Sequence, residues 1–421
     1  MLMTYKKINT EELNQDDFYV FYLEVTKENF KLVQQLVKEG VIYSKSVKLR
    51  SDIELVSKPA KIEELICSGL SFKLGPNVSE SIRAIYPAQP SPSDGWLRYW
   101  RPKEIWERLN NLANTRNDIC ELIKLDQETH GFAIDSHEED GTYPLGLRIG
   151  KVRNGSKPAI LIVGGIHGDE FISHAALMGL IGKLITIKNE ILQECNFFIL
   201  PLLNPDGLSY SILNGIPWRK NTNSILSSRF ASSSLGVDLN RNFPIYFGYR
   251  GASSDIESLT FSGSYPLSEP ETIGLNRLIR KEKSIIMALD CHAGEEFKLY
   301  RPTIRDKLHT ASAEWDYTRT VNEFDDTLYK VVEERLSDDL NQHHGEHQYQ
   351  FMLPGEYSGT SDEYFYHAIN ILGFAIEFVK EKRPNPIESV SEQVNMLHTA
   401  LISLAKSCIQ LKLNKLLTRK K

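Results

Sequence analysis

The sequence predicts an α/β fold: a mainly parallel mixed sheet with helices on both faces, preceded by a small α+β domain. The run from Ile160 to Val163 is wholly apolar and ends at two glycines, as in a strand buried on both faces. Residues 171–185, which come soon after it, place apolar side chains at helical spacing. Further apolar runs alternate with helical patterns toward the end of the chain, which favours a parallel sheet.

Residues 18–75 alternate strand-like and helix-like segments. In order, the expected elements are a strand at 18–25, a helix at 27–39, a strand at 52–56, a helix at 61–67 and a strand at 72–74. Two short strand–helix–strand units are typical of a small α+β domain. Residues 87–95 then combine proline, serine and glycine, which indicates a linker. We therefore expect one domain at 1–92 and a second at 93–421.

The second domain continues the alternation over a longer stretch. Besides the central unit, its expected elements are a helix at 102–114, strands at 120–125, 145–149 and 196–202, a helix at 268–283, strands at 284–291 and 371–379, and a helix at 388–416. Residues 204–263 are predicted to be irregular, and residues 294–358 to form a charged, helix-containing excursion. Ser268 and Glu271 match a capping box, so the helix is expected to begin at Ser268.

The composition is that of an ordinary soluble globular protein. Of 421 residues, 41% are hydrophobic and 25% charged, so the chain can bury a sizeable core. The formal net charge of −6 argues against a dedicated nucleic-acid-binding protein. No apolar stretch is long enough to cross a bilayer, and residues 1–7 lack the apolar core of a signal peptide. We expect a cytoplasmic protein with no membrane contact, unless a signal has been removed; the oligomeric state is left open.

His167 and Glu170 follow the central apolar strand at the point where it turns into its helix. Ligands of α/β sheets bind at this edge, and an imidazole and a carboxylate three residues apart can reach one ion. His292 follows a second apolar strand and can join them. Two imidazoles and one carboxylate leave a fourth tetrahedral position open, which is typical of a catalytic zinc. We therefore predict one zinc ion per chain, held by His167, Glu170 and His292.

Glu377 is the one charged residue in the apolar run at 371–379. Burying an ionised carboxylate without a partner is expensive, so its presence needs a functional reason. A general base that takes a proton from zinc-activated water, and passes it to the leaving amine, supplies that reason.

Five stretches resemble the zinc carboxypeptidases of the carboxypeptidase A/B type. They are His-Gly-Asp-Glu at 167–170, Asn-Pro-Asp-Gly at 204–207, Trp-Arg-Lys at 218–220, Val-Asp-Leu-Asn-Arg-Asn-Phe at 237–243 and Phe-Ala-Ile-Glu-Phe at 374–378. The stretches at 268–271 and 290–292 lie between them in the right order, and the match covers about residues 95–410. The resemblance implies a zinc carboxypeptidase-like catalytic domain at 93–421, and residues 1–92 look like the small prodomain of some relatives.

The resemblance also implies roles for the matched residues. It makes Glu377 the general base, and Arg219 the cation that shares with zinc the negative charge on the former carbonyl oxygen. It assigns Asn240 and Arg241 to the free C-terminal carboxylate of the substrate, which the planar fork of arginine binds bidentately. The implied partner is a peptide or peptide-like molecule with such a carboxylate. The Asn-Pro-Asp-Gly stretch is interpreted as a structural turn.

Two further site residues follow from counting back along the chain from Glu377. The family's mobile tyrosine falls on Gly355 in this register, and Tyr357, two residues later, is the candidate for its place. Asp362 falls on the position at the base of the specificity pocket. By resemblance, an aspartate there is typical of the B type, which prefers C-terminal lysine or arginine. The alternative interpretation of Asp362 is a helix N-cap before residues 363–369.

We weigh the leading function against three alternatives. The leading function is a zinc-dependent carboxypeptidase that hydrolyses the C-terminal peptide bond through zinc-activated water and prefers basic C-terminal residues. The same site could serve a carboxypeptidase or amidase of cell-wall peptides, whose diaminopimelate also ends in a free carboxylate. A zinc deacylase of acylated amino acids would not need Asn240 and Arg241 to bind a C-terminal carboxylate. A catalytically dead binding protein would be expected to lose a metal ligand or the base, and this chain keeps all four.

Overall fold

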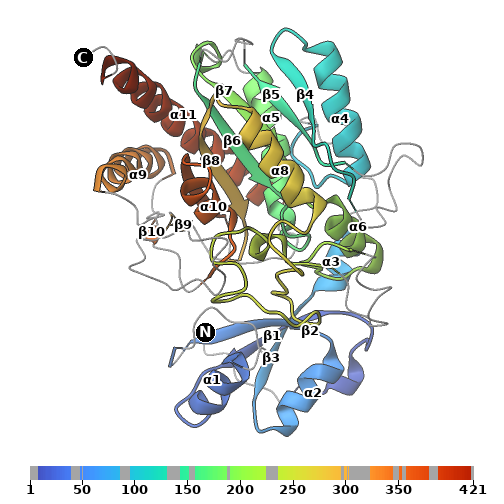
Figure 1. Ribbon diagram of the computed structural model, residues 1–421. Helices are drawn as coiled ribbons and strands as arrows, with labels where there is room; N and C mark the ends of the chain where they lie inside the picture. Colours follow the sequence, from blue (N-terminus) through green and yellow to red (C-terminus); the bar gives the residue numbers. More distant parts are fainter. Residues whose placement is uncertain are drawn as a thin grey trace. The chain divides into compact units, whose positions relative to one another are not determined.

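The computed structural model describes residues 8–38, 48–49, 51–85, 95–129, 143–150, 157–186, 190–223, 236–294, 298–300, 302, 323–344, 350–352, 357–378 and 387–418. The chain divides into two compact units (Figure 1). The small unit contains Met1–Gln89 and Ser211–Pro217, and the large unit contains Pro90–Tyr210 and Trp218–Lys421. The predicted domain boundary at residue 92 lies outside the described residues.

The small unit is built on a three-stranded antiparallel sheet with the order β2–β1–β3. Its elements are η1 (Thr10–Glu12), β1 (Tyr19–Glu24), α1 (Phe30–Lys38), β2 (Asp52–Ser57), α2 (Pro59–Cys67), β3 (Phe72–Asn77) and α3 (Val78–Ile85). Phe21 and Leu23 of the central strand share one hydrophobic core with Val33 of α1 and Ile62 of α2. The α+β prediction for this part of the chain is confirmed, and α3 is an addition to it.

The large unit is built on an eight-stranded mixed sheet with the order β10–β9–β11–β8–β6–β7–β5–β4. The strands are β4 (Cys120–Lys124), β5 (Leu145–Ile149), β6 (Ala159–Gly164), β7 (Asn196–Leu200), β8 (Ile285–His292), β9 (Lys298–Tyr300), β10 (Gln350–Met352) and β11 (Leu372–Glu377). The four central strands β11, β8, β6 and β7 are parallel to their neighbours in this group. Their carboxyl ends therefore lie at one edge of the sheet.

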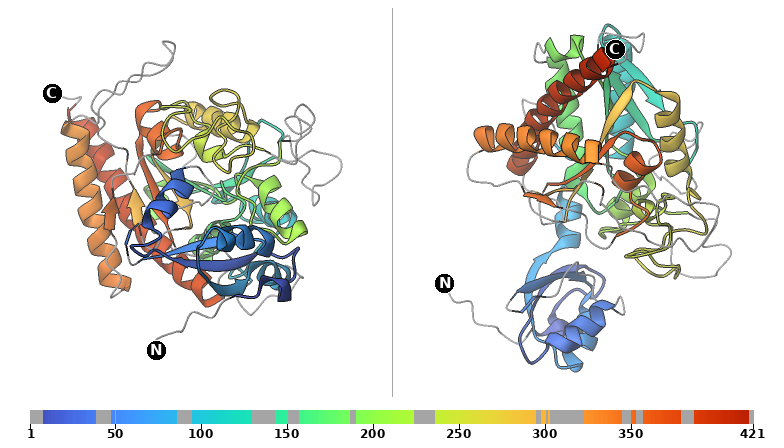
Figure 2. Two further views of the ribbon diagram at one scale, coloured as in Figure 1. Left: turned by 90° about the horizontal axis from the view of Figure 1, so that it is seen from below. Right: turned by 60° about the vertical axis from the view of Figure 1, so that its left-hand side comes forward.

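Helices cover both faces of this sheet (Figures 1 and 2). The helical elements are α4 (Pro102–Thr115), α5 (Phe171–Thr186), η2 (Glu190–Gln193), α6 (Pro205–Asn214), η3 (Leu239–Arg241), α8 (Pro270–Lys281), α9 (Glu323–His344), α10 (Ser361–His367) and α11 (Ile387–Thr418). On one face, Leu161 and Val163 of β6 share a core with Leu275 of α8 and Phe365 of α10. The opposite face is covered by α5 and α11, which contact each other and β6. The predicted α/β class is confirmed.

Two local predictions were wrong. Residues 204–263 are not irregular throughout, because α6 begins at Pro205, whose fixed φ suits the first turn of a helix. The helix expected to begin at Ser268 begins at Pro270, with Glu269 as its N-cap residue and no capping side-chain hydrogen bond. The Ser268 hydroxyl instead donates to Glu269 Oε1 at 2.7 Å and accepts from Asn242 Nδ2 at 2.9 Å.

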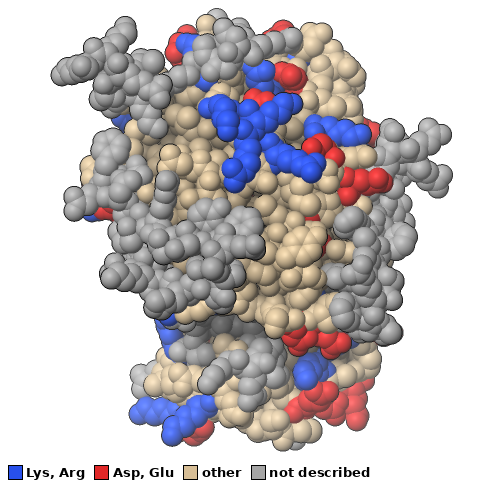
Figure 3. Space-filling view, in the orientation of Figure 1, with Lys and Arg blue, Asp and Glu red and all other residues tan. Residues whose placement is uncertain are grey.

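Lysine and arginine side chains gather over α8 on the face shown in Figure 3. Arg277, Arg280, Lys281 and Lys283 are all exposed near the end of this helix. Cations are favoured there by the helix dipole, and Arg277 also pairs with Asp126 at 2.9 Å. A solvated helix end accounts for this cluster. Within the described residues, no helix has the length and apolar character needed to cross a membrane.

Candidate metal and catalytic centre

The loop after β6 presents His167 and Glu170 at the carboxyl edge of the sheet. Gly165 turns the chain with φ +58°, a conformation that glycine adopts without strain. Gly168 is needed for a different reason: a Cβ there would lie 2.3 Å from the backbone of Gly207. The loop thus lies directly against the start of α6, and its backbone has little freedom to move.

The Asn-Pro-Asp-Gly stretch fixes this loop from the other side. Asn204 Nδ2 donates to the carbonyl of Ile166 at 3.1 Å, and Asn204 Oδ1 accepts from the backbone of Gly207 at 2.8 Å. The backbone of Gly168 also donates to the carbonyl of Arg219 at 3.2 Å. The stretch is therefore structural, as the sequence suggested, but Pro205–Gly207 forms the start of α6 and not a turn, and it holds the loop that carries His167 and Glu170.

His167, Glu170 and His292 converge on one point. Each offers a ligand atom within 4.8 Å of the other two. Glu170 lies between the rings, with Oε1 at 2.9 Å from His167 Nδ1 and Oε2 at 3.0 Å from His292 Nδ1. All three residues are at most 4% exposed. The convergence follows from the sheet, because β6 and β8 are adjacent and pair Gly164 with Cys291.

Both imidazoles have a carboxylate behind them. His167 Nε2 lies 3.2 Å from Asp238 Oδ1, and His292 Nε2 lies 3.1 Å from Asp290 Oδ2. Metal-binding histidines usually donate the ring N–H that does not face the metal to such a carboxylate, and here Nδ1 is the nitrogen that faces Glu170. The donor set, its burial and these two carboxylates fit a zinc ion held by two nitrogens and one carboxylate.

Asp238 connects the metal ligands to Arg219. It is fully buried, and its Oδ2 accepts from Arg219 Nε at 2.9 Å. Burial alone would raise the pKa of Asp238, but the guanidinium groups of Arg219 and Arg241 outweigh it and hold the pKa well below its ordinary value. The anion in turn keeps Arg219 beside the centre, with Nη1 3.6 Å from Glu170 Oε1.

Lys220 anchors the segment that carries Arg219. Its ammonium is buried and donates to the carbonyls of Ile256 at 2.8 Å and Ser258 at 3.1 Å. Burial lowers its pKa to about 8, which is still above neutral pH. The lysine of the Trp-Arg-Lys motif thus ties two loops together and does not enter the centre.

Asn240 and Arg241 lie on η3, whose N-cap is Asp238. Asp238 Oδ1 accepts from the backbone of Asn240 at 3.0 Å. Arg241 is aimed by two backbone carbonyls: Nε donates to Gly251 at 2.8 Å and Nη1 to Asn240 at 2.7 Å. The guanidinium lies over the ring of Tyr357, with Cζ 4.9 Å from its centroid. The structure therefore brings Tyr357 to the Arg241 side chain.

Gly359 brings the segment before α10 against η3. It has φ +71°, and a Cβ would lie 2.4 Å from the carbonyl oxygen of Arg241. Asn240 Oδ1 then accepts from the backbone of Ser361 at 2.8 Å, and Asn240 Nδ2 lies 3.2 Å from His292 Nε2. Asn240 is thus within contact of a metal ligand and of the helix that carries Asp362.

Glu377 and Asp362 approach the centre from β11 and α10. Glu377 is the last residue of β11 and pairs in register with His292 of β8. Asp362 is the second residue of α10, whose N-cap residue is Thr360, so the N-cap interpretation of Asp362 is wrong. Its carboxyl is buried, and burial, with the charges of Glu363 and Asp290, raises its pKa to about 6.

Comparison of the sequence with protein families and characterised relatives agrees with this geometry. The family model described as zinc carboxypeptidase matches residues 107–399, more than half of the chain. The chain belongs to the zinc carboxypeptidase family. It is 26% identical over 318 residues to zinc carboxypeptidase A 1 of Drosophila melanogaster, covering 70% of each chain. It is 37% identical over 161 residues to carboxypeptidase B of Rattus norvegicus, covering 37% of this chain and 38% of the relative.

Solved structures show the same fold over most of the chain. The structure of thrombin activatable fibrinolysis inhibitor has a TM-score of 0.76 at 21% identity, covering 94% of this chain and 99% of the other. Carboxypeptidase A from Helicoverpa armigera has a TM-score of 0.73 at 18% identity, covering 94% and 98%. The protein is thus a zinc metallocarboxypeptidase with a His-Glu-His site, and zinc is its cofactor.

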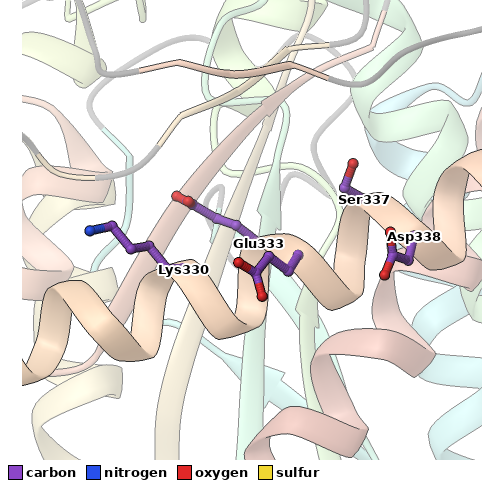
Figure 4. Close-up of a pocket in the computed structure, with 5 residues that line it drawn as sticks. Lys330, Glu333, Ser337 and Asp338 are labelled. Atoms are coloured by element: carbon purple, nitrogen blue, oxygen red, sulfur yellow. The ribbon is translucent and has the colours of Figure 1, made fainter.

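A hollow along α9 lies apart from these residues (Figure 4). It is lined by Lys330, Glu333, Glu334, Ser337 and Asp338. All five residues belong to one helix, and Lys330 pairs with Asp326 of the same helix at 2.8 Å. None of the metallocarboxypeptidase site residues contributes to it, so this hollow adds nothing to the centre.

Sequence reasoning gave no role to Asp238 or Asp290. Asp238 stood inside a recognised motif, but its partner His167 is 71 residues away. Asp290 had a local signal, because residues two apart on a strand point to the same face and Asp290 precedes His292 by two. An aspartate in an otherwise apolar strand could have been questioned in the same way as Glu377.

Proposed function

We propose that this zinc metallocarboxypeptidase removes single residues from the C-terminus of peptides and prefers basic ones. The observation that carries the proposal is the placement of Asn240 and Arg241 side by side on η3: the Arg241 guanidinium donates to the carbonyl of Asn240, and the Asn240 amide lies 3.2 Å from His292 Nε2. A cation near the metal ligands would place a terminal carboxylate, and therefore the last peptide bond, beside them.

Zinc bound by His167, Glu170 and His292 would polarise the scissile carbonyl and make the attacking water more acidic. Glu377 is proposed to take the proton from that water at its carboxylate and to deliver it to the leaving amine. The register of β11 against β8 supports this role, because it puts Glu377 beside His292. A glutamine at 377 would keep the shape and lose the base.

Arg219 is proposed to stabilise the negative charge that develops on the carbonyl oxygen. Its position is supported by Asp238, which holds Nε while Nη1 lies 3.2 Å from His167 Nδ1. A donor that is already fixed before the reaction stabilises a developing charge without reorganising. Removal of one such donor typically costs roughly 10²–10³-fold in kcat.

Arg241 and Asn240 are proposed to bind the terminal carboxylate, with Tyr357 covering it. The two backbone hydrogen bonds of Arg241 fix the plane of the guanidinium, which lowers the entropy lost on binding. The Arg241 guanidinium lies over the ring of Tyr357, which places the ring beside a ligand bound to Arg241. Asp362 is proposed to receive the side chain of the residue that is removed.

The proposal can be tested with one peptide in three forms: a free C-terminus, a C-terminal amide, and the Nα-acylated last residue alone. A carboxypeptidase should lose about 100-fold or more in kcat/KM on amidation, because the charge that Arg241 binds is gone. Arg241→Lys should lose most of the difference in kcat/KM between the acid and the amide. Lysine keeps the positive charge but cannot bind both carboxylate oxygens at once. Faster hydrolysis of the acylated amino acid would identify a deacylase and contradict the proposal.

A further inference from the structure

Asp290 is a fully buried carboxylate that the proposed reaction does not use. Its Oδ2 faces His292 Nε2 at 3.1 Å and also accepts the hydroxyl of Ser361. Its Oδ1 has no hydrogen-bond partner among the described residues. A buried carboxyl group with one oxygen left without a hydrogen-bond partner is costly in an apolar strand, so its position calls for a compensating gain.

The neighbours of His292 allow two arrangements of its ring proton. If Nε2 carries the proton, it donates to Asp290 and leaves Nδ1 as an acceptor facing Glu170. If Nδ1 carries the proton, Nε2 can accept from Asn240 Nδ2 at 3.2 Å, and no acceptor remains for a cation beside Glu170. The tautomer is therefore decided by competition between Asp290 and Asn240 for the same ring nitrogen.

We propose that Asp290, seated by Ser361, is a positioning residue that fixes His292 with Nδ1 as a metal ligand. The anion favours the Nε2–H form and makes the imidazole a better donor to a cation. Ser361 holds the anion in place, because its hydroxyl donates to the same oxygen that accepts from His292. The inference rests on His292 being a ligand of the proposed centre, and it adds a carboxylate and a hydroxyl from two separate elements.

Ser361 also connects this pair to the substrate side of the site. Its backbone donates to Asn240 Oδ1 at 2.8 Å, and it is followed in α10 by Asp362. Ser361 thus engages Asn240 Oδ1 as an acceptor, which leaves Asn240 Nδ2 facing His292, and its hydroxyl holds the carboxylate of Asp290. The start of α10 is in this way part of the metal centre.

Zinc affinity measured by competition with a chromogenic chelator tests the proposal without relying on turnover. Asp290→Asn should weaken zinc binding by about 10–100-fold, the range found for partners of metal ligands. Ser361→Ala should weaken it less and in the same direction, and Ser361→Thr, which keeps a hydroxyl, should restore it. The double variant Asp290→Asn/Ser361→Ala should bind zinc as weakly as Asp290→Asn alone, because Ser361 acts through Asp290.

Glu271→Gln is the matched control. Glu271 is also fully buried, and its pKa is raised by burial and by the charges of Glu269 and Asp206, but its hydrogen bonds go to Asn221. This variant should bind zinc like the parent. If Asp290→Asn and Ser361→Ala both bind within twofold of the parent, the positioning role is wrong. If Asp290→Asn does not fold, the contrast between Ser361→Ala and Ser361→Thr decides. A parent that binds no zinc would instead refute the ligand set.

Discussion

Asp362→Asn changes one buried charge and almost nothing else, so it isolates the proposed selection of basic residues. The side chain is 4% exposed at the start of α10. Asparagine has the same shape and cannot be ionised. A matched pair of substrates, identical peptides that end in arginine or in citrulline, isolates the charge on the other side, because citrulline keeps the shape of arginine and is neutral.

The magnitude follows from the pKa of Asp362. Burial, Glu363 and Asp290 raise it from 3.8 to about 6, which is roughly two units. At 1.36 kcal/mol per unit, this shift means that the site disfavours the ionised form of Asp362 by about 3 kcal/mol. The guanidinium of a C-terminal arginine in the substrate can offset this free energy. Since 1.4 kcal/mol is tenfold, we expect kcat/KM to favour arginine over citrulline by on the order of 100-fold, and Asp362→Asn to remove most of this ratio.

The same pKa sets the pH dependence. The anion is the form that binds a cation, so the preference should be nearly full about one unit above pH 6, should be about half at pH 6 and should fall further as the pH drops below this value. Taking the ratio of the two substrates cancels the titration of groups that act on both. A ratio near one in the parent, an unchanged ratio in Asp362→Asn, or a ratio that is flat between about pH 5 and 7 would each refute the reasoning.

The stability of the protein offers an independent check on this carboxyl. Its folded pKa is raised, so its stabilising contribution is complete below about 3.8 and is lost as the pH rises through about 6. Asp362→Asn should therefore increase the free energy of unfolding more at pH 8 than at pH 4, by up to about 3 kcal/mol. Urea unfolding at the two pH values measures this, and an equal effect at both would contradict the raised pKa.

Three further predictions concern the centre and the small unit. Glu377→Gln should bind zinc normally and lose about 10²-fold or more in kcat at little change in KM, whereas retention of a tenth of the parent kcat would contradict a general base. His167→Ala should abolish the single equivalent of zinc seen by metal analysis of the parent, and full occupancy after loss of both His167 and His292 would refute the ligand set. By the resemblance of residues 1–92 to the small prodomain of some relatives, their removal should raise kcat/KM on long peptides more than on dipeptides; equal effects, or an insoluble remainder, would indicate a stabilising role.

The sequence alone predicted the class of the fold and the three residues of the His-Glu-His site. The fully buried run at 160–163 and the helical pattern after it are local features, because periodicity records which faces a segment buries. His167 and Glu170 are three residues apart, and His292 ends a buried strand, so topology was enough to bring the three together. Proline also marks helix starts, and α8 begins at Pro270 and not at the residue that the capping-box pattern indicates.

Only the tertiary structure decided which groups support these ligands. Asp238 lies 71 residues from His167, and Ser361 lies 71 residues from Asp290, so neither pair has a pattern in the chain. Such pairs depend on the register of β6, β8 and β11 and on the close approach of Gly359 to η3. Register is fixed by the packing of whole faces, and not by the propensity of any one segment. The sequence therefore determined which residues could bind a metal, while the packing decided their orientation and the charges behind them.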